Sequence, residues 1–135
     1  MVQADVWRLL GNKGDRVPFI VADASAIALG DFLELATPMT VTAHAGNVDT
    51  PIVGIAAEEK VANDGHLLIT GITNCIFKAT TVAGGSCTIG DGVSMSATAG
   101  SVDVSSTLDI EKGWSVGIAY ETAGASETGL FRSTF

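Results

Sequence analysis

Short apolar or alternating stretches follow one another along the whole chain, and clusters of Gly, Asn, Asp and Ser separate them. Phe32 and Glu34 alternate with the flanking leucines in the manner of a half-buried strand. Strands of this kind are predicted at 17–22, 32–35, 39–43, 51–56, 66–72, 75–80, 93–97, 102–104, 114–120 and 128–132. About ten short strands with turn signals between them predict an all-β fold, either a compact barrel or a sandwich.

One sequence unit occurs twice in the chain. Val53-Gly54-Ile55-Ala56-Ala57-Glu58 returns as Val116-Gly117-Ile118-Ala119-Tyr120-Glu121. Leu29-Gly30-Asp31 precedes the first copy, and Ile89-Gly90-Asp91 precedes the second. Gly30 and Gly54 are 24 residues apart in the first copy, and Gly90 and Gly117 are 27 residues apart in the second. This internal repeat predicts that the fold is one β unit used twice, with loops of different length.

The repeated strand carries a glycine in an otherwise apolar stretch. Residues 51–56 are nearly all apolar, which predicts burial on both faces of the strand. Gly54 is therefore expected to mark a β-bulge or a place where another backbone comes close. Asn63-Asp64-Gly65 is the strongest hairpin-type turn signal, and it leads into the strand at 66–72.

The first sixteen residues differ from the rest. Their apolar positions, 2, 6, 9 and 10, fit one or two helical turns, too few to form an independent helix, and the turn cluster 11–15 follows. We interpret 1–16 as an N-terminal arm and 17–135 as a single β domain. Pro18 restricts the strand at 17–22 to a sheet edge, to a strand start or to pairing with another subunit. Trp7 either anchors the arm in a partner's pocket or covers the chain's own core.

Composition narrows the class of protein. The chain has 135 residues, which suits one domain, and 47% of them are hydrophobic but only 6% aromatic. No apolar stretch approaches the roughly 18 residues of a membrane span, so we expect no membrane partner. The N-terminus lacks the basic and then apolar pattern of a secretory signal, so we expect synthesis and residence inside a cell, or packaging into something assembled there.

The net charge of −8 is unevenly distributed. Residues 1–16 carry three basic residues against two acidic ones, and the remainder carries four against thirteen. A body this acidic repels phosphate backbones, which argues against nucleic acid as a partner. The N-terminal arm is either a contact for an acidic partner or an ordinary solvated terminus.

Residues with catalytic or metal-binding potential are few. His44 and His66 lie in different segments, without the spacing of a metal site. Cys75 and Cys87 either pair or, as is commoner in a cytosolic chain, remain buried free thiols. A Cys–His dyad would have to form in space, and each of these residues also has an ordinary packing explanation.

The remaining candidates are weaker still. Glu58 and Glu59 are consecutive strand residues that point to opposite faces, which makes a poor acid and base couple. The glycine-rich segments 84–86 and 90–92 lack the Lys-Ser/Thr continuation of a phosphate loop and are predicted turns. We therefore expect no catalytic residues, no metal and no cofactor, and a protein that is not an enzyme.

The order of these motifs resembles a known family. Gly30-Asp31-Phe32-Leu33, Val53 to Glu58, Asp64-Gly65 with the strand to Gly71, Gly90-Asp91, and Val116 to Ala119 together resemble the small tailed-phage capsid decoration, or cement, proteins. The resemblance covers roughly residues 17–135. It implies a compact β domain that sits as a homotrimer on the outer surface of the virion shell and clamps neighbouring major capsid subunits. Synthesis in the host cytoplasm would then precede assembly, and the resemblance brings no catalytic residues with it.

The expected partner contact follows from the arm and the edge strand. We predict that the major capsid protein or a second subunit contacts Trp7, Arg8, Arg16, Val17, Pro18, Phe19 and Ile20. An exposed edge at 17–22 invites strand addition, so removal of residues 1–16 should weaken shell binding and leave the domain folded.

Three other functions remain open from the residues alone. A β-barrel module for a small ligand or sugar would need aromatic residues clustered at a pocket, and the sequence shows no such cluster. A tail or fibre accessory protein of the virion would share the trimeric β character. A cysteine-dependent enzyme is the third.

Overall fold

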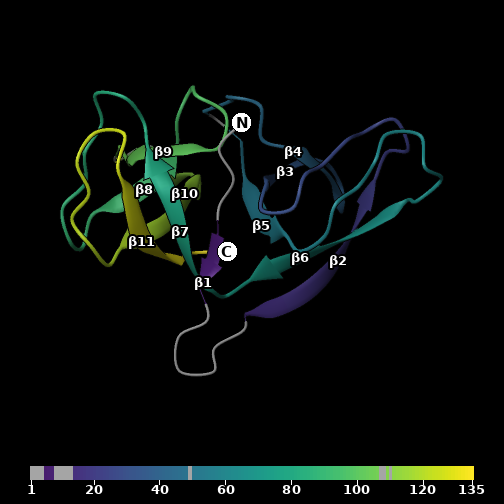
Figure 1. Cartoon of the computed structure of the whole chain (residues 1–135), viewed down its shortest axis with the longest axis horizontal. Helices are drawn as coiled ribbons and strands as arrows, with labels where there is room; N and C mark the ends of the chain where they lie inside the picture. Colours follow the sequence, from purple (N-terminus) through teal and green to yellow (C-terminus); the bar gives the residue numbers. More distant parts are fainter. Residues whose placement is uncertain (1–4, 8–13, 49, 107–108, 110) are drawn as a thin grey trace.

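The computed structural model describes residues 5–7, 14–48, 50–106, 109 and 111–135. Strands account for most of the regular structure in this part of the chain, as predicted (Figure 1). The strands are β1 (Asp5–Trp7), β2 (Asp15–Val21), β3 (Phe32–Thr37), β4 (Thr40–Ala43), β5 (Ile52–Ala56), β6 (Leu68–Thr73), β7 (Ile76–Thr81), β8 (Gly92–Met95), β9 (Ser101–Val104), β10 (Ser115–Ala119) and β11 (Thr128–Ser133). No helix among the described residues is long and apolar enough to cross a membrane.

Ten of these strands form two barrels of the same topology, which lie side by side in Figure 1. In the first barrel the strand order is β2-β4-β3-β5-β6, closed by β2 against β6. The second barrel follows the order β7-β9-β8-β10-β11, with β7 pairing β11 and β9. In each barrel one pairing is parallel, β2 with β4 and β7 with β9, and the other four are antiparallel. The all-β barrel and its internal repeat are thus confirmed.

The repeated motifs form the same local structure in both barrels. Gly30 and Gly90 both have a positive φ, the left-handed conformation that glycine adopts without strain. The N–H of Gly30 donates to the carbonyl of Ala56, and that of Gly90 donates to the carbonyl of Ala119. The aspartate after each glycine accepts the backbone N–H of the residue three positions before it. Each turn is therefore tied to the repeated strand of its own barrel.

The predicted bulge occurs in both copies of the repeated strand. Leu33 faces Gly54 and its neighbour Glu34 faces Ile52, so one residue of β5 is skipped. The pairing of β8 with β10 shows the same irregularity between Ser115 and Gly117. An inserted residue bends the strand and increases its twist, which helps a small sheet to close.

Burial on both faces of β5 is also confirmed, and the second barrel explains it. Ala56 lies in the core of the first barrel, a cluster of Phe19, Val21, Ile27, Leu33, Val41, Ala56 and Ile69. Ile52 and Ile55 belong instead to a larger cluster that includes residues of the second barrel. Both faces of β5 therefore pack against apolar side chains, with Val53 half-buried and the other four residues buried.

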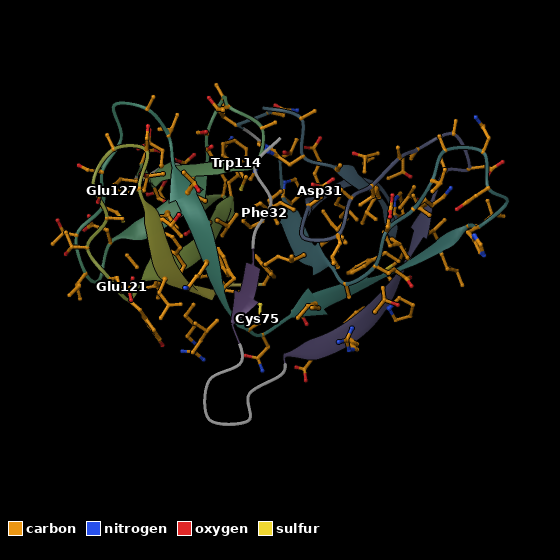
Figure 2. All side chains as sticks on the ribbon, in the orientation of Figure 1. Asp31, Phe32, Cys75, Trp114, Glu121 and Glu127 are labelled. Carbon is orange, nitrogen blue, oxygen red and sulfur yellow. The ribbon has the colours of Figure 1, made fainter. Side chains whose placement is uncertain are left out.

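Aromatic rings hold the two barrels together. Phe32 from β3 meets Phe77 from β7 edge to face, with ring centroids 5.6 Å apart. Phe77 also stacks on Phe131, at 5.7 Å, and on Phe135, at 6.1 Å. Figure 2 shows Phe32 at the junction of the barrels. Such ring pairs add to the burial of apolar area, and they belong to the larger of the two core clusters, which contains residues of both barrels.

A buried histidine forms a second contact between the barrels. His44, at the end of β4, accepts the N–H of Gly100 at Nδ1 (3.2 Å), and its Nε2 lies 2.9 Å from the carbonyl of Asn47. Since Nδ1 accepts, the proton of the neutral ring is assigned to Nε2, which donates to Asn47. At Gly46 a Cβ would lie 2.6 Å from the carbonyl oxygen of Ala97, so the two loops fit closely.

Two expectations require correction. Residues 5–7 form a strand rather than a helical turn, because β7 offers an edge with which they pair, and the remaining positions of that helical pattern lie outside the described residues. The turn at 63–65 does not form a tight hairpin, since β5 ends at Ala56 and β6 begins only at Leu68. A tertiary interaction of Lys60, described below, holds the longer connection.

Candidate interaction surface

β2 positions most of the residues that the sequence assigns to partner contact. Arg16, Pro18 and Ile20 alternate along the strand and are exposed on its outer side. Phe19 is only 6% exposed and lies in the core of the first barrel, because successive strand residues point to opposite faces. Val17 is half-buried. Arg8 and the side chain of Trp7 lie outside the described residues, although the backbone of Trp7 belongs to β1.

Among the residues that the structure describes, no strand pairs with one edge of β2 over much of its length. β2 pairs with β6 from Asp15 to Ile20 but with β4 only at Ile20 and Val21. The N–H of Ile20 donates to the carbonyl of Met39, on the β4 side, whereas that of Val21 donates toward β6. Because backbone groups alternate in direction along a strand, Pro18 faces the open edge. The missing N–H of Pro18 therefore removes no hydrogen bond between β2 and β6. Of the three alternatives that the sequence allowed for this proline, the structure shows a sheet edge.

The corresponding edge of the second barrel is covered. β7 pairs with β9 only at Thr80 and Thr81. Along the rest of its edge, residues Ile76, Phe77 and Lys78 pair antiparallel with the three residues of β1. The described part of the N-terminal segment thus pairs with its own chain.

A buried lysine organises the connection between β5 and β6. The ammonium of Lys60 donates to the carbonyls of Asp23 and Val61, both at 3.0 Å, and to Oδ1 of Asp64 at 2.8 Å. The hydrogen bond from Lys60, together with that from the N–H of His66, holds the pKa of Asp64 well below its usual range. In the second barrel Ala123 takes the place of Lys60, so this network belongs to the first barrel alone.

An exposed apolar patch lies where this connection enters β6. We define the apolar patch as Ile20, Met39, Leu67 and Leu68. Ile20 and Leu68 are direct partners across β2 and β6, and the carbonyls of Met39 and Leu67 accept N–H groups of β2. Sequence reasoning selected only Ile20. Two adjacent leucines directly after a turn, Leu67 and Leu68, were a signal available in the sequence. Their position beside β2 depends on strand pairing, which the sequence pattern does not specify.

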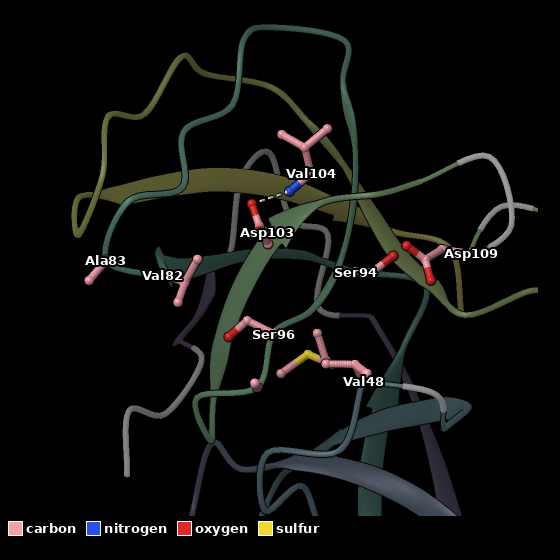
Figure 3. Close-up of a pocket in the computed structure, with 10 residues that line it drawn as sticks. Val48, Val82, Ala83, Ser94, Ser96, Asp103, Val104 and Asp109 are labelled. Carbon is pink, nitrogen blue, oxygen red and sulfur yellow. Dashed lines mark hydrogen bonds between the residues drawn. The ribbon is translucent and has the colours of Figure 1, made fainter.

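A hollow of about 490 Å³ lies mainly on the second barrel, with Val48 from the first barrel at its margin (Figure 3). Its polar lining includes Ser94, Ser96, Asp103 and Asp109. The carboxylate of Asp103 accepts its neighbour's N–H, that of Val104, and Asp109 accepts from the backbone and hydroxyl of Ser106. These acids are engaged in local hydrogen bonds, and the described residues that line the hollow include no aromatic residue and no histidine.

Metal ligands do not converge in the described part of the chain, where no group of three or more His, Cys, Asp or Glu residues is placed to hold an ion. His44 is buried at the contact between the barrels, and His66 is exposed beside Asp64.

The two cysteines are free and buried. Burial raises the pKa of the Cys75 thiol to about 11, although a hydrogen bond involving Ser133 acts in the opposite direction. Cys87 lies in the cluster shared by the barrels. The thiolate is the reactive form of cysteine, so burial and a raised pKa both oppose reaction.

We expect both thiols to resist an aromatic disulfide reagent in the folded protein. Relative to a thiol with the ordinary pKa of 9.0, a pKa of about 11 lowers the thiolate fraction of Cys75 at neutral pH about 100-fold, and steric exclusion adds to this. Absorbance would follow the reaction with and without guanidinium, and unfolding should release both thiols. Rapid reaction of either thiol in the folded protein would contradict the burial described here.

Comparison with known proteins identifies a related fold. No protein-family model matches the chain, and no curated protein sequence matches it. Among solved structures, the chain is similar to the head fibre gp8.5 N base in bacteriophage phi29, with a TM-score of 0.52 and 12% sequence identity. The match covers 89% of this chain and 93% of the phage chain. At this identity the likeness concerns the fold, and it spans both barrels.

Proposed function

We propose that this chain is a structural protein of a phage virion that binds the outer surface of the capsid. The carrying observation is the fold shared with the base of a phage head fibre over 89% of the chain. In the finer form of the proposal, the protein acts as a cement protein, bridging neighbouring major capsid subunits and stabilising the shell. A homotrimer suits this role, since a closed cyclic interface matches a threefold position on an icosahedral lattice.

The architecture supports an adhesive rather than a catalytic role. Two barrels with a common core form a rigid body that can present separate surfaces to its own copies and to a shell. Of the groups that a Cys–His catalytic proposal would use, His44 and the two cysteines are packed in the interior, whereas His66 is exposed beside Asp64. A net charge of −8 favours solubility of the free protein before assembly.

The base of a head fibre is a second candidate, because the similar solved chain carries that description. Both candidates place the chain on the phage head and differ in copy number. A cement protein occurs in a near-fixed ratio to the major capsid protein over the whole shell, whereas a fibre base is confined to the attachment sites of the fibres.

Fractionation of a native lysate tests the proposal. Quantitative mass spectrometry would follow this chain and the abundant proteins across a density gradient. Migration with megadalton shells in a near-fixed ratio to one abundant large protein is expected. If the chain remains at the size of a small oligomer while intact shells are present, the virion proposal fails and a ligand-binding module becomes the better explanation.

Deletion of residues 1–13 tests the contribution of the arm. This deletion is preferred to removal of residues 1–16, because Asp15 and Arg16 pair with Thr73 and Ile72 in the first barrel. We expect weaker binding to purified shells that lack this chain, together with a folded protein by circular dichroism. The full-length chain is the control, and a second variant that keeps residues 1–13 and carries Trp7→Ala tests the predicted contact of that residue separately. Unchanged shell occupancy of the truncated protein would remove the arm from the contact.

A further inference from the structure

The two barrels allow a comparison of equivalent surfaces within one chain. Ile20 pairs with Leu68 at one end of the β2–β6 ladder, and Thr80 pairs with Thr128 at the same end of the β7–β11 ladder. The carbonyl of Leu67 accepts an N–H from β2, as that of Glu127 accepts one from β7. Three apolar residues of the patch therefore have polar equivalents in the second barrel.

Met39 adds a backbone observation of its own. It precedes Thr40, which pairs with Ile20, whereas Gly100 precedes Ser101, which pairs with Thr80. Both residues have a positive φ, 56° at Met39 and 77° at Gly100. A methionine in this left-handed region is strained relative to an ordinary conformation, whereas glycine adopts it freely. The first barrel thus keeps a strained and exposed apolar side chain where its counterpart has glycine.

The fold itself does not require this apolar patch. Its four residues are 48–62% exposed, so they contribute little to the core. The second barrel builds the same ladders with threonine, glutamate and glycine at the equivalent positions. Apolar residues gathered at one place without a packing role are typical of an interaction surface. We propose that the apolar patch of the first barrel is the surface that docks onto the capsid, an inference that rests on the proposed function.

The surroundings of the patch define the chemistry of the partner. Leu68 borders a small hollow that is also lined by Glu58, Glu59, Lys60, Asp64 and His66. Lys60 forms an ion pair with Asp64, which leaves Glu58 and Glu59 as the acids that Lys60 does not neutralise. Glu58 is held there because it accepts the N–H of Thr70, two residues along β6. Arg16, the base on the outer side of β2, is four residues from Ile20, about 13 Å along a strand. The rim nearest Leu68 is therefore acidic.

Charge complementarity selects a different protein over a second copy. Two copies that met through this patch would bring acidic rims together, and each copy carries a net charge of −8. A partner that covers the patch needs an apolar hollow bordered by Lys or Arg side chains. The occupant is accordingly a surface of the major capsid subunit with an apolar centre and a basic rim.

The second barrel supplies the residues for a direct test. A patch variant carries Ile20→Thr, Met39→Gly, Leu67→Glu and Leu68→Thr, the residues that the same fold uses in its other half. The matched control carries Ile89→Thr and Ile118→Thr, which change two exposed apolar residues of the second barrel. Purified shells that lack this chain are the probe, and binding is measured by co-sedimentation over a range of protein concentrations. Circular dichroism and thermal unfolding verify that both variants fold.

We expect the patch variant to bind shells at least 10-fold more weakly than the wild type. The control variant should bind as tightly as the wild type. Equal binding by the patch variant, or an equal loss in the control, overturns the docking surface and leaves the virion proposal intact. Failure of the wild-type protein to bind shells removes both. A change in the oligomeric state of the free patch variant, seen by sedimentation velocity, would assign the patch to self-association and overturn the capsid as its occupant.

Discussion

Replacement of Phe77 by alanine is expected to lower the free energy of unfolding by about 3–5 kcal/mol, the range for truncation of a buried phenylalanine. Phe77 is fully buried and its ring meets Phe32, Phe131 and Phe135. Removing the ring leaves a cavity that both barrels border, because Phe32 belongs to the first barrel and the other two rings to the second.

Guanidinium unfolding, followed by circular dichroism and by tryptophan fluorescence, measures this loss. Phe77→Leu serves as the control and should cost less than half as much, since most of the buried volume is kept. Phe19→Ala, in the separate cluster of the first barrel, should destabilise the whole chain in one transition because the larger core cluster is shared by both barrels. Two separate transitions in the wild-type protein would contradict that shared core.

The equivalent glycines of the repeat should respond differently to alanine. At Gly117 a Cβ would lie 2.8 Å from the carbonyl oxygen of Arg132 and 3.3 Å from the ring of Phe77. At Gly54 the nearest atom, the carbonyl oxygen of Ile72, would lie at 3.4 Å, an ordinary contact. We expect Gly117→Ala to lower the free energy of unfolding by about 2–3 kcal/mol, because a backbone atom must shift.

Gly54→Ala should cost less than about 1 kcal/mol. Neither glycine has a positive φ, so alanine also reduces the entropy of the unfolded chain, which offsets about 0.4–1 kcal/mol at each site. The same denaturation experiment compares the two variants side by side. Equal destabilisation would show that the repeated strands pack alike, against the contacts described here.

The β fold could be predicted because its determinants are local. Alternation of apolar and polar residues locates strands, and the Gly-Asp turns with their glycine-bearing strands locate the repeat. Gly54 and Gly117 both adjoin the expected bulge. Residues 5–7 were an exception, because their sequence pattern indicated a helical turn. They form a strand that pairs with the edge of β7, an interaction that the local pattern does not specify.

The candidate surface was predictable only in part. Pro18 marked the open edge correctly, because a residue without an N–H excludes a paired position. Ile20 was also predicted as a contact residue and is exposed. Phe19 was predicted as well, but its side chain points into the core of the first barrel. Met39 and Leu68 were not selected, since their place beside Ile20 depends on which strands pair and in which register.

By itself, the sequence determined the all-β class, most strand positions, the twofold use of one unit and an acidic body, because these depend on residue types and spacings along the chain. Only the tertiary structure decided that each unit closes into its own barrel, that Phe77 packs against rings of both barrels, and that Ile20, Met39, Leu67 and Leu68 form an exposed apolar patch on the first barrel. These features arise from contacts between residues far apart in sequence. Such contacts form only when strand pairing has fixed the register, and a local pattern does not specify that register.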